Sequence, residues 1–113
     1  MIYATEEPLA LLEINAHNGA SYAHLSYICP KLKYVGYESN LSYIPLTIKE
    51  AHITYTDYDN IDFCQYNKEF NYIIINNATE YSEAERNSLY ARLYGCLKAD
   101  GQLIWNDNTP HND

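Results

Sequence analysis

The chain has 113 residues and a formal net charge of −8, and 47% of its residues are hydrophobic and 19% charged. This length fits one domain, because single hydrophobic cores usually serve about 100 to 150 residues, and the composition is that of a globular protein rather than a disordered one. The negative charge argues against nucleic acid as a direct ligand, since binding to a phosphate backbone depends on Lys and Arg, and no apolar run reaches the roughly 20 residues that cross a bilayer.

The first half of the chain alternates strand-length apolar runs with amphipathic stretches, as expected of a parallel sheet covered by helices. Pro30 ends the first amphipathic stretch, because proline cannot continue a helix. Ser39, Asn40 and Ser42 are candidate caps of the second stretch, whose first turn tolerates Pro45. The expected elements are, in order, a strand over Leu9–Ile14, a helix over Ala20–Ile28, a strand over Leu32–Tyr37 closed by Glu38, a helix over Tyr43–Ala51 and a strand over Ile53–Thr56.

The second half begins with the strongest strand signal, Phe70–Asn77, which contains the consecutive β-branched residues Ile73–Ile75. Such a run is typical of a strand buried on both faces. Ser82 and Glu85 then form a capping box that predicts the start of a helix. The remaining features are a helical apolar stripe of Leu89, Leu93 and Leu97 flanked by Tyr90 and Tyr94, a turn at Asp100–Gly101, and a fifth strand over Gln102–Trp105.

Five strands alternating with helices predict an α/β fold in which a doubly wound, mostly parallel sheet has helices on both faces. Ligands of such sheets bind beyond the carboxyl ends of the strands. Glu38 closes the second strand there, and a carboxylate can accept hydrogen bonds from both the 2′ and 3′ hydroxyls of a ribose. The alternative is a solvated strand terminus, but the roughly 20 residues between the first loop and Glu38 match a nucleotide-binding fingerprint.

Five segments of the chain form an ordered series. In the first, Leu12–Ala20, an acidic residue is followed at every second position by Asn15, His17 and Gly19. The other segments are Tyr34–Glu38, Thr56–Phe63, Phe70–Tyr81 and Leu97–Ile104. In this order they resemble the motifs of class I S-adenosylmethionine-dependent methyltransferases, whose first motif carries glycines after the acid. The resemblance covers about Leu9–Trp105 and implies a Rossmann-like five-stranded sheet of order 3-2-1-4-5 that lacks the family's usual C-terminal strand pair.

The resemblance implies S-adenosylmethionine as the cofactor and assigns roles to individual residues. Glu13 would orient the first loop and approach the methionine ammonium, Gly19 would let the backbone close on the methionine part, and Glu38 would bind the ribose. Asn15 and His17 belong to the same loop. The residues expected to complete the site are Asp57, Tyr58, Asp59 or Asn60 along the adenine, and Asn76 near the methionine carboxyl and methyl end.

Asn15 and His17 depart from the motif, because each replaces a glycine. Asparagine enters the left-handed backbone region more readily than other residues with a side chain. An imidazole at a position where backbone approaches a ligand either swings out or occupies part of the cofactor site. Two interpretations therefore remain open, an intact cofactor site and a weakened or abolished one. A solvated loop histidine is a simpler interpretation of His17 than a catalytic one.

Glu80 follows the fourth strand, where many small-molecule methyltransferases of this family carry a histidine or an acid, and it is the candidate general base. Alternatively, Glu80 only favours the positive end of the helix that begins after Ser82. Methyl transfer from a sulfonium depends chiefly on the alignment of the nucleophile with the methyl group. Acid or base chemistry is therefore not required for the activity.

The leading functional hypothesis is an S-adenosylmethionine-binding, methyltransferase-like protein that methylates a small molecule or needs a partner to complete the acceptor pocket. The alternative is a catalytically inactive scaffold or regulatory subunit, and a third possibility is another reaction of the same cofactor, such as its cleavage. A nicotinamide-binding Rossmann domain fits less well. Its GxGxxG spacing would place the third glycine at Ala20, and the acid at Glu13 is foreign to it.

The fifth strand, Gln102–Trp105, would be a bare sheet edge, because the family usually continues with a further helix and two antiparallel strands. Exposed edges recruit other chains through their free backbone groups. We therefore expect a homo-oligomer or a protein partner at this edge.

The spacing of the cysteines and the first residues of the chain indicate the cellular compartment of the protein. Cys29, Cys64 and Cys96 have neither a disulfide pattern nor the spacing of zinc ligands, which favours buried free thiols and no metal. The acidic pair Glu6–Glu7 stands where a secretory signal would be basic. These features favour a cytoplasmic protein.

Overall fold

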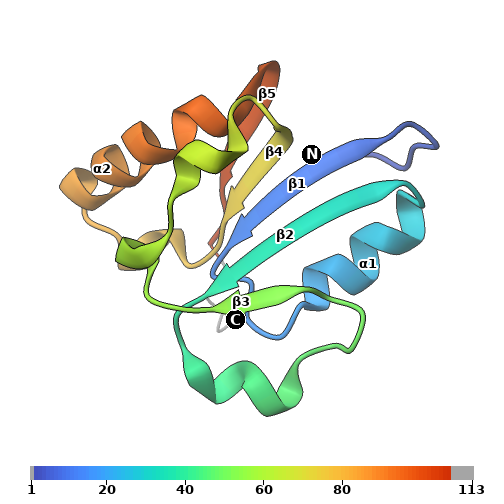
Figure 1. Ribbon diagram of the computed structural model, residues 1–113, viewed down its shortest axis with the longest axis horizontal. Coiled ribbons are helices and arrows are strands. Elements are labelled where there is room, and N and C mark those ends of the chain that lie inside the picture. The colour runs from blue at the N-terminus through green and yellow to red at the C-terminus, as the bar shows by residue number, and fades with distance from the viewer. Residues whose placement is uncertain (1, 108–113) are drawn as a thin grey trace, which may run out of the picture.

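The computed structural model describes residues 2–107, and its centre is a sheet of five parallel strands (Figure 1). The strand order is β3-β2-β1-β4-β5, so β1 lies between β2 and β4. The strands are β1 (Leu9–Ile14), β2 (Leu32–Glu38), β3 (Ile53–Tyr55), β4 (Phe70–Ile75) and β5 (Leu97–Trp105), and the α-helices of the described residues are α1 (Ala20–Ile28) and α2 (Glu83–Leu93). The predicted α/β class and strand order are confirmed.

The two α-helices cover opposite faces of the sheet. On one face, Leu12 of β1 belongs to a buried cluster that includes Leu89 of α2. The neighbouring residue Leu11 pairs with Tyr34 of β2, whose ring contacts Tyr22 of α1 at a centroid distance of 5.2 Å. Because successive side chains of a strand point to opposite faces, α1 and α2 lie on different sides, as a doubly wound sheet requires.

Helix α2 begins as predicted and ends earlier. The Ser82 Oγ accepts the N–H of Glu85 at 3.1 Å, and the Glu85 Oε1 accepts the N–H of Ser82 at 2.9 Å, which completes the capping box. The apolar stripe is buried as far as Leu93, where the helix ends. The prediction that Leu97 continues this stripe is wrong, because the chain tightens into the 3-10 turn η5 (Tyr94–Cys96) and Leu97 starts β5.

The prediction of a helix over Tyr43–Ala51 is wrong. The structure has a 3-10 helix, η1 (Leu41–Leu46), which starts two residues earlier and ends sooner. Asn40 is its cap, and the Asn40 Oδ1 accepts the N–H of Ser42 at 3.0 Å. Pro45 lies inside η1, and a proline there has no N–H to donate and clashes with the carbonyl four residues earlier. An α-helix therefore cannot run through this segment without a break.

Strand β5 is longer than predicted, and Asp100–Gly101 is part of a bulge within it rather than a turn before it. Leu97 pairs with Phe70 of β4, and the next pair on this ladder is Gln102 with Tyr72. The intervening residues of β5 therefore loop out against a single residue of β4. A Cβ on Gly101 would lie 3.0 Å from the carbonyl oxygen of Phe70, a tight contact that glycine avoids.

The cysteines only partly follow the prediction. Cys29 and Cys96 are buried and free, whereas Cys64 is exposed. Cys64 lies in the 3-10 turn η3 (Phe63–Tyr66), where Phe63 takes the position that faces the core and its neighbour points outward. Among residues 2–107, no helix combines the length and apolar character that a membrane span needs.

Candidate functional site

The loop between β1 and α1 has left-handed backbone at every second residue. The φ angles of Asn15, His17 and Gly19 are 59°, 56° and 89°. A Cβ on Gly19 would lie 2.5 Å from the Cβ of Ala51, so both the backbone angle and the available space require glycine there. The loop thus keeps the conformation expected of three alternating glycines, although two of them are replaced.

The imidazole of His17 packs against η1. It stacks on the ring of Tyr43 in η1, with a centroid distance of 4.9 Å and an interplanar angle of 26°. The carbonyl oxygen of His17 accepts a hydrogen bond from the hydroxyl of Tyr55 at 2.9 Å.

The backbone of the loop is bonded to the acid that closes β2. The Glu38 Oε1 accepts the N–H of His17 at 2.9 Å, and its Oε2 accepts the N–H of Asn40 at 2.7 Å. The residue is only 3% exposed, so Glu38 is not a solvated strand terminus. The first loop and this carboxylate therefore lie side by side at the carboxyl ends of β1 and β2.

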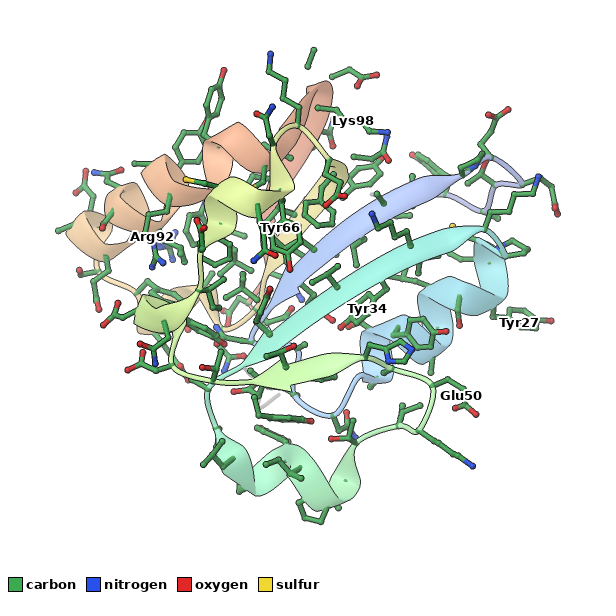
Figure 2. The ribbon with its side chains drawn as sticks, viewed as in Figure 1. Tyr27, Tyr34, Glu50, Tyr66, Arg92 and Lys98 are labelled. Carbon is green, nitrogen blue, oxygen red and sulfur yellow. The ribbon has the colours of Figure 1, made fainter. Side chains whose placement is uncertain are left out.

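Glu13 is fully buried beneath the loop. Its Oε1 accepts the hydroxyl of Tyr34 at 2.5 Å, and its Oε2 accepts the Nδ2 of Asn76 at 2.7 Å. Figure 2 shows Tyr34 between β2 and α1. Burial raises the pKa of Glu13, although the hydrogen bonds from Tyr34 and Asn76 lower it, and burial also raises the pKa of the Tyr34 phenol. Glu13 is thus linked to the loop through Asn76, whose Nδ2 also donates to the carbonyl oxygen of Asn15.

Asn76 joins the ends of three strands. Besides the bond to Glu13, its Nδ2 donates to the carbonyl oxygen of Asn15 at 3.0 Å, and its Oδ1 accepts the Nδ2 of Asn106 at 2.9 Å. It is 2% exposed, so its amide is a buried connector of β1, β4 and the end of β5. In the present arrangement the amide supports the loop rather than lining an open site.

Two tyrosines meet over the first loop. The hydroxyl of Tyr58, from the turn η2 (Tyr58–Asn60), donates to the Asn15 Oδ1 at 2.5 Å and accepts the Asn15 N–H at 3.0 Å. The Asn15 Nδ2 donates to the hydroxyl of Tyr81 at 3.0 Å. Burial raises the pKa of both phenols, so both remain protonated at neutral pH. We call Asn15, Tyr58 and Tyr81 the tyrosine bridge. A hollow of about 210 Å³, lined by both tyrosines, lies beside it and extends to Arg92 of α2.

The remaining predicted site residues are at the surface. Asp57, Asp59 and Asn60 are exposed, and the Asp57 Oδ1 accepts the N–H of Asp59 at 3.2 Å as the cap of η2. Glu80 is exposed in the turn η4 (Ala78–Glu80), where its Oε1 accepts the Nδ2 of Asn77 at 3.3 Å. No group of three or more His, Cys, Asp or Glu side chains within residues 2–107 is arranged to hold a metal ion.

Sequence reasoning missed most of the tyrosines around the loop. The sequence has 13 tyrosines, and its motifs assign only Tyr58 to the site. The structure adds Tyr34 below the loop, Tyr43 and Tyr55 beside His17, and Tyr81 above Asn15. One available signal was position, because Tyr58 and Tyr81 both follow shortly after strands that end at the ligand side of the sheet.

Comparisons with known proteins identify the fold. No family model matches the sequence, and no curated protein matches it. Solved structures do match: PKMT2 from Rickettsia typhi in complex with AdoHcy has 17% sequence identity and a TM-score of 0.70, and the match covers 88% of this chain and 20% of that one. A SAM-dependent methyltransferase from Archaeoglobus fulgidus has 13% identity and a TM-score of 0.66, with 88% and 45% covered. The sugar N-methyltransferase KedS8 from a Streptoalloteichus species has 17% identity and a TM-score of 0.65, with 87% and 40% covered.

These similarities show that the chain has the class I methyltransferase fold. The chain spans less than half the length of each of these three proteins.

Proposed function

We propose that this chain is an S-adenosylmethionine-binding domain of methyltransferase type, which methylates a small molecule or needs a partner to complete the acceptor pocket. The observation that carries the proposal is the left-handed backbone at Asn15, His17 and Gly19, joined to Glu38 through the His17 N–H at 2.9 Å. These features lie at the switch point of a doubly wound sheet, where β1 leads to α1 on one face and β4 leads to α2 on the other. The similar solved structures include a methyltransferase in complex with AdoHcy.

Glu38 is the residue to which we assign ribose binding. Each of its oxygens already accepts one backbone N–H, and a carboxylate oxygen has a second lone pair for a ribose hydroxyl. The exposed residues Asp57, Asp59 and Asn60 would flank the adenine, since they follow β3 beside the end of β2. The bound cofactor supplies a methyl group on a sulfonium, and the acceptor must then be aligned with it. Glu80, exposed in η4 after β4, is the residue of this chain that we assign as a base for that acceptor.

Calorimetric titration with S-adenosylmethionine and S-adenosylhomocysteine tests the proposal. We expect the native chain to bind both, and Glu38→Gln to weaken binding about tenfold or more, because hydrogen bonds to a charged group are worth about 1.5 to 3 kcal/mol. Glu50→Gln is the matched control, because this substitution removes the same charge from an exposed residue on the loop before β3 (Figure 2). Absence of heat at millimolar ligand, or equal weakening by both variants, would contradict the assignment.

The tyrosine bridge favours a second candidate function, that of an inactive scaffold or regulatory subunit. A ligand lying across the ends of β1 and β4 must displace the hydroxyls of Tyr58 and Tyr81 from Asn15. The variant Asn15→Gly with His17→Gly restores the glycines and removes the amide on which both hydroxyls converge. If the native chain binds no ligand and this variant does, while partner binding is unchanged, the chain is a scaffold.

We further propose that the outer edge of β5 pairs with a second copy of the chain or with a partner strand. Within residues 2–107, β5 pairs only with β4, so the backbone groups along Gln102–Trp105 lack a strand on their other side. Leu103→Pro removes one of the backbone N–H groups, and we expect it to shift the sedimentation coefficient to that of the monomer. A native chain that is monomeric at every concentration would refute self-association.

A further inference from the structure

Lysines gather at the end of the sheet opposite the candidate site. The chain has seven basic residues against 15 acidic ones, and four of the seven line one hollow. Lys31 directly precedes β2 and Lys33 lies at its start, Lys68 lies just before β4, and Lys98 lies at the start of β5. Figure 2 shows Lys98 at this end of the sheet. The positive charge of an acidic protein is thus concentrated at the amino ends of its strands.

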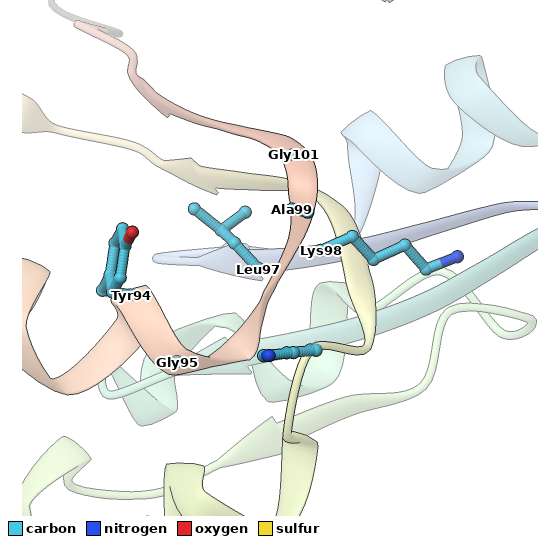
Figure 3. A pocket seen from close by; sticks show the side chains of 7 residues that line it. Tyr94, Gly95, Leu97, Lys98, Ala99 and Gly101 are labelled. Atoms are coloured by element: carbon cyan, nitrogen blue, oxygen red, sulfur yellow. The ribbon is translucent and has the colours of Figure 1, made fainter.

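The hollow between these lysines has a volume of about 410 Å³. Asn67 and Asn71 also line it, and the Asn71 side chain is fixed because its Oδ1 accepts the N–H of Ala10 at 2.9 Å. A second hollow of about 340 Å³ shares Lys68 and Lys98 with the first and continues to Tyr94 (Figure 3). Small-molecule sites usually measure about 300 to 1,000 Å³, so the space suits a small ligand.

Among the described residues, one of the four lysine charges in the hollow is paired with an acid. Glu69 is the acidic residue among its lining residues, and its Oε1 pairs with the Nζ of Lys33 at 2.7 Å. The described residues show no ion pair for Lys31, Lys68 or Lys98. Several ammonium groups around one hollow repel each other, and an anion placed among them would relieve this repulsion.

The backbone near Lys68 and Lys98 is hydrogen-bonded between two segments, and Lys68 itself has an unfavourable backbone conformation. Lys68 has a φ of 50°, a left-handed conformation that residues with a side chain rarely adopt. Its N–H donates to the carbonyl oxygen of Gly95 at 2.8 Å, and the N–H of Glu69 donates to that of Cys96 at 2.9 Å. These bonds tie the segment before β4 to the turn before β5, and so keep Lys68 next to Lys98. Asparagine or glycine would suit this backbone better than lysine does.

We propose that this lysine hollow binds a small polyanion that carries phosphate or carboxylate groups. The side chains present there, ammonium groups with two carboxamides, are the donors that such groups accept from. Nucleic acid is a poorer fit, because an extended phosphate backbone would also meet the acidic remainder of a chain with a net charge of −8. The hollow lies at the opposite end of the strands from Glu38, so this site is independent of the proposed cofactor site.

Isothermal titration of the full chain with inorganic pyrophosphate and with citrate tests the proposal, and the tighter of the two identifies the group that the hollow prefers. We expect saturable binding, and a weakening of about fivefold for Lys98→Gln and for Lys31→Gln, the upper range for one exposed charge pair. The matched control is Lys49→Gln, which removes the same charge from an exposed residue between η1 and β3. Affinity for S-adenosylhomocysteine should be the same in all three variants.

Two outcomes would overturn the proposal. One is the absence of saturable binding of either anion at low ionic strength. The other is an equal loss of affinity in Lys49→Gln and Lys98→Gln, which would show that only the net charge of the chain matters. Circular dichroism of the three variants should match that of the native chain, because each changes one exposed side chain.

Discussion

Replacing Asn76 with alanine should destabilise the domain by about 3 to 5 kcal/mol. The change removes the bond to the carboxylate of Glu13, for which about 1.5 to 3 kcal/mol is typical, and bonds to Asn15 and Asn106 of about 1 kcal/mol each. It also leaves one oxygen of a fully buried carboxylate without its donor. Since a domain of this size has a stability of about 5 to 15 kcal/mol, we expect the melting temperature to fall by about 10 to 20 °C.

Urea denaturation followed by far-ultraviolet circular dichroism measures this loss. Asn60→Ala is the control, because Asn60 is exposed and such substitutions usually change stability by less than about 0.5 kcal/mol. The double variant with Glu13→Gln isolates the role of the carboxylate, since a neutral amide without its donor costs less than a charged group. The reasoning is refuted if Asn76→Ala costs less than about 1 kcal/mol, or if the effects of the two substitutions simply add.

Three further predictions follow from single contacts. Ser82→Ala should cost about 1 kcal/mol through loss of the helix cap, while Ser88→Ala within α2 should be neutral or stabilising; equal urea midpoints would contradict this. Because burial raises the pKa of Glu13 above its usual value of 4.5, the folded state binds a proton that the unfolded state releases, so the stability of the native chain relative to Glu13→Gln should fall as the pH rises above 4.5. Denaturation curves between about pH 4 and 8 check the sign. Tyr58→Phe should cost about 1 kcal/mol of stability and tighten S-adenosylhomocysteine binding in calorimetry, whereas the exposed Tyr90→Phe should do neither.

The elements that the sequence predicts well are those specified by local chemistry. The isoleucine run Ile73–Ile75 lies in β4, and the capping box at Ser82 starts α2, because β-branched runs and caps act through near neighbours. The left-handed tolerance of asparagine likewise anticipated the conformation of Asn15. In each case the residues that decide the structure lie within a few positions of one another.

The features that the sequence did not predict depend on contacts between distant segments. The bulge in β5 is a matter of register against β4, and no local pattern shows that Leu97 pairs with Phe70. Tyr58 and Asn15, whose side chains share a hydrogen bond, lie 43 positions apart in the sequence. Nothing in the sequence distinguishes Tyr58 from a tyrosine that only packs. The lysine hollow likewise combines Lys31 with Lys98, which only the parallel sheet brings to the same end.

The tyrosine bridge changes how binding at the first loop must be understood. A glycine loop leaves its backbone open to a ligand, whereas here the Asn15 amide engages Tyr58 and Tyr81 in place of solvent. The proposed cofactor would therefore bind only the fraction of molecules in which these bonds are open, and its apparent affinity would be reduced by that fraction. Each hydroxyl bond is worth about 1 kcal/mol, so breaking two of them lowers affinity by about thirtyfold unless the ligand or acceptor replaces them. An acceptor that accepts the freed phenolic hydrogen of Tyr58 and donates a hydrogen to the Tyr81 oxygen would recover this loss, and cofactor and acceptor would then bind cooperatively.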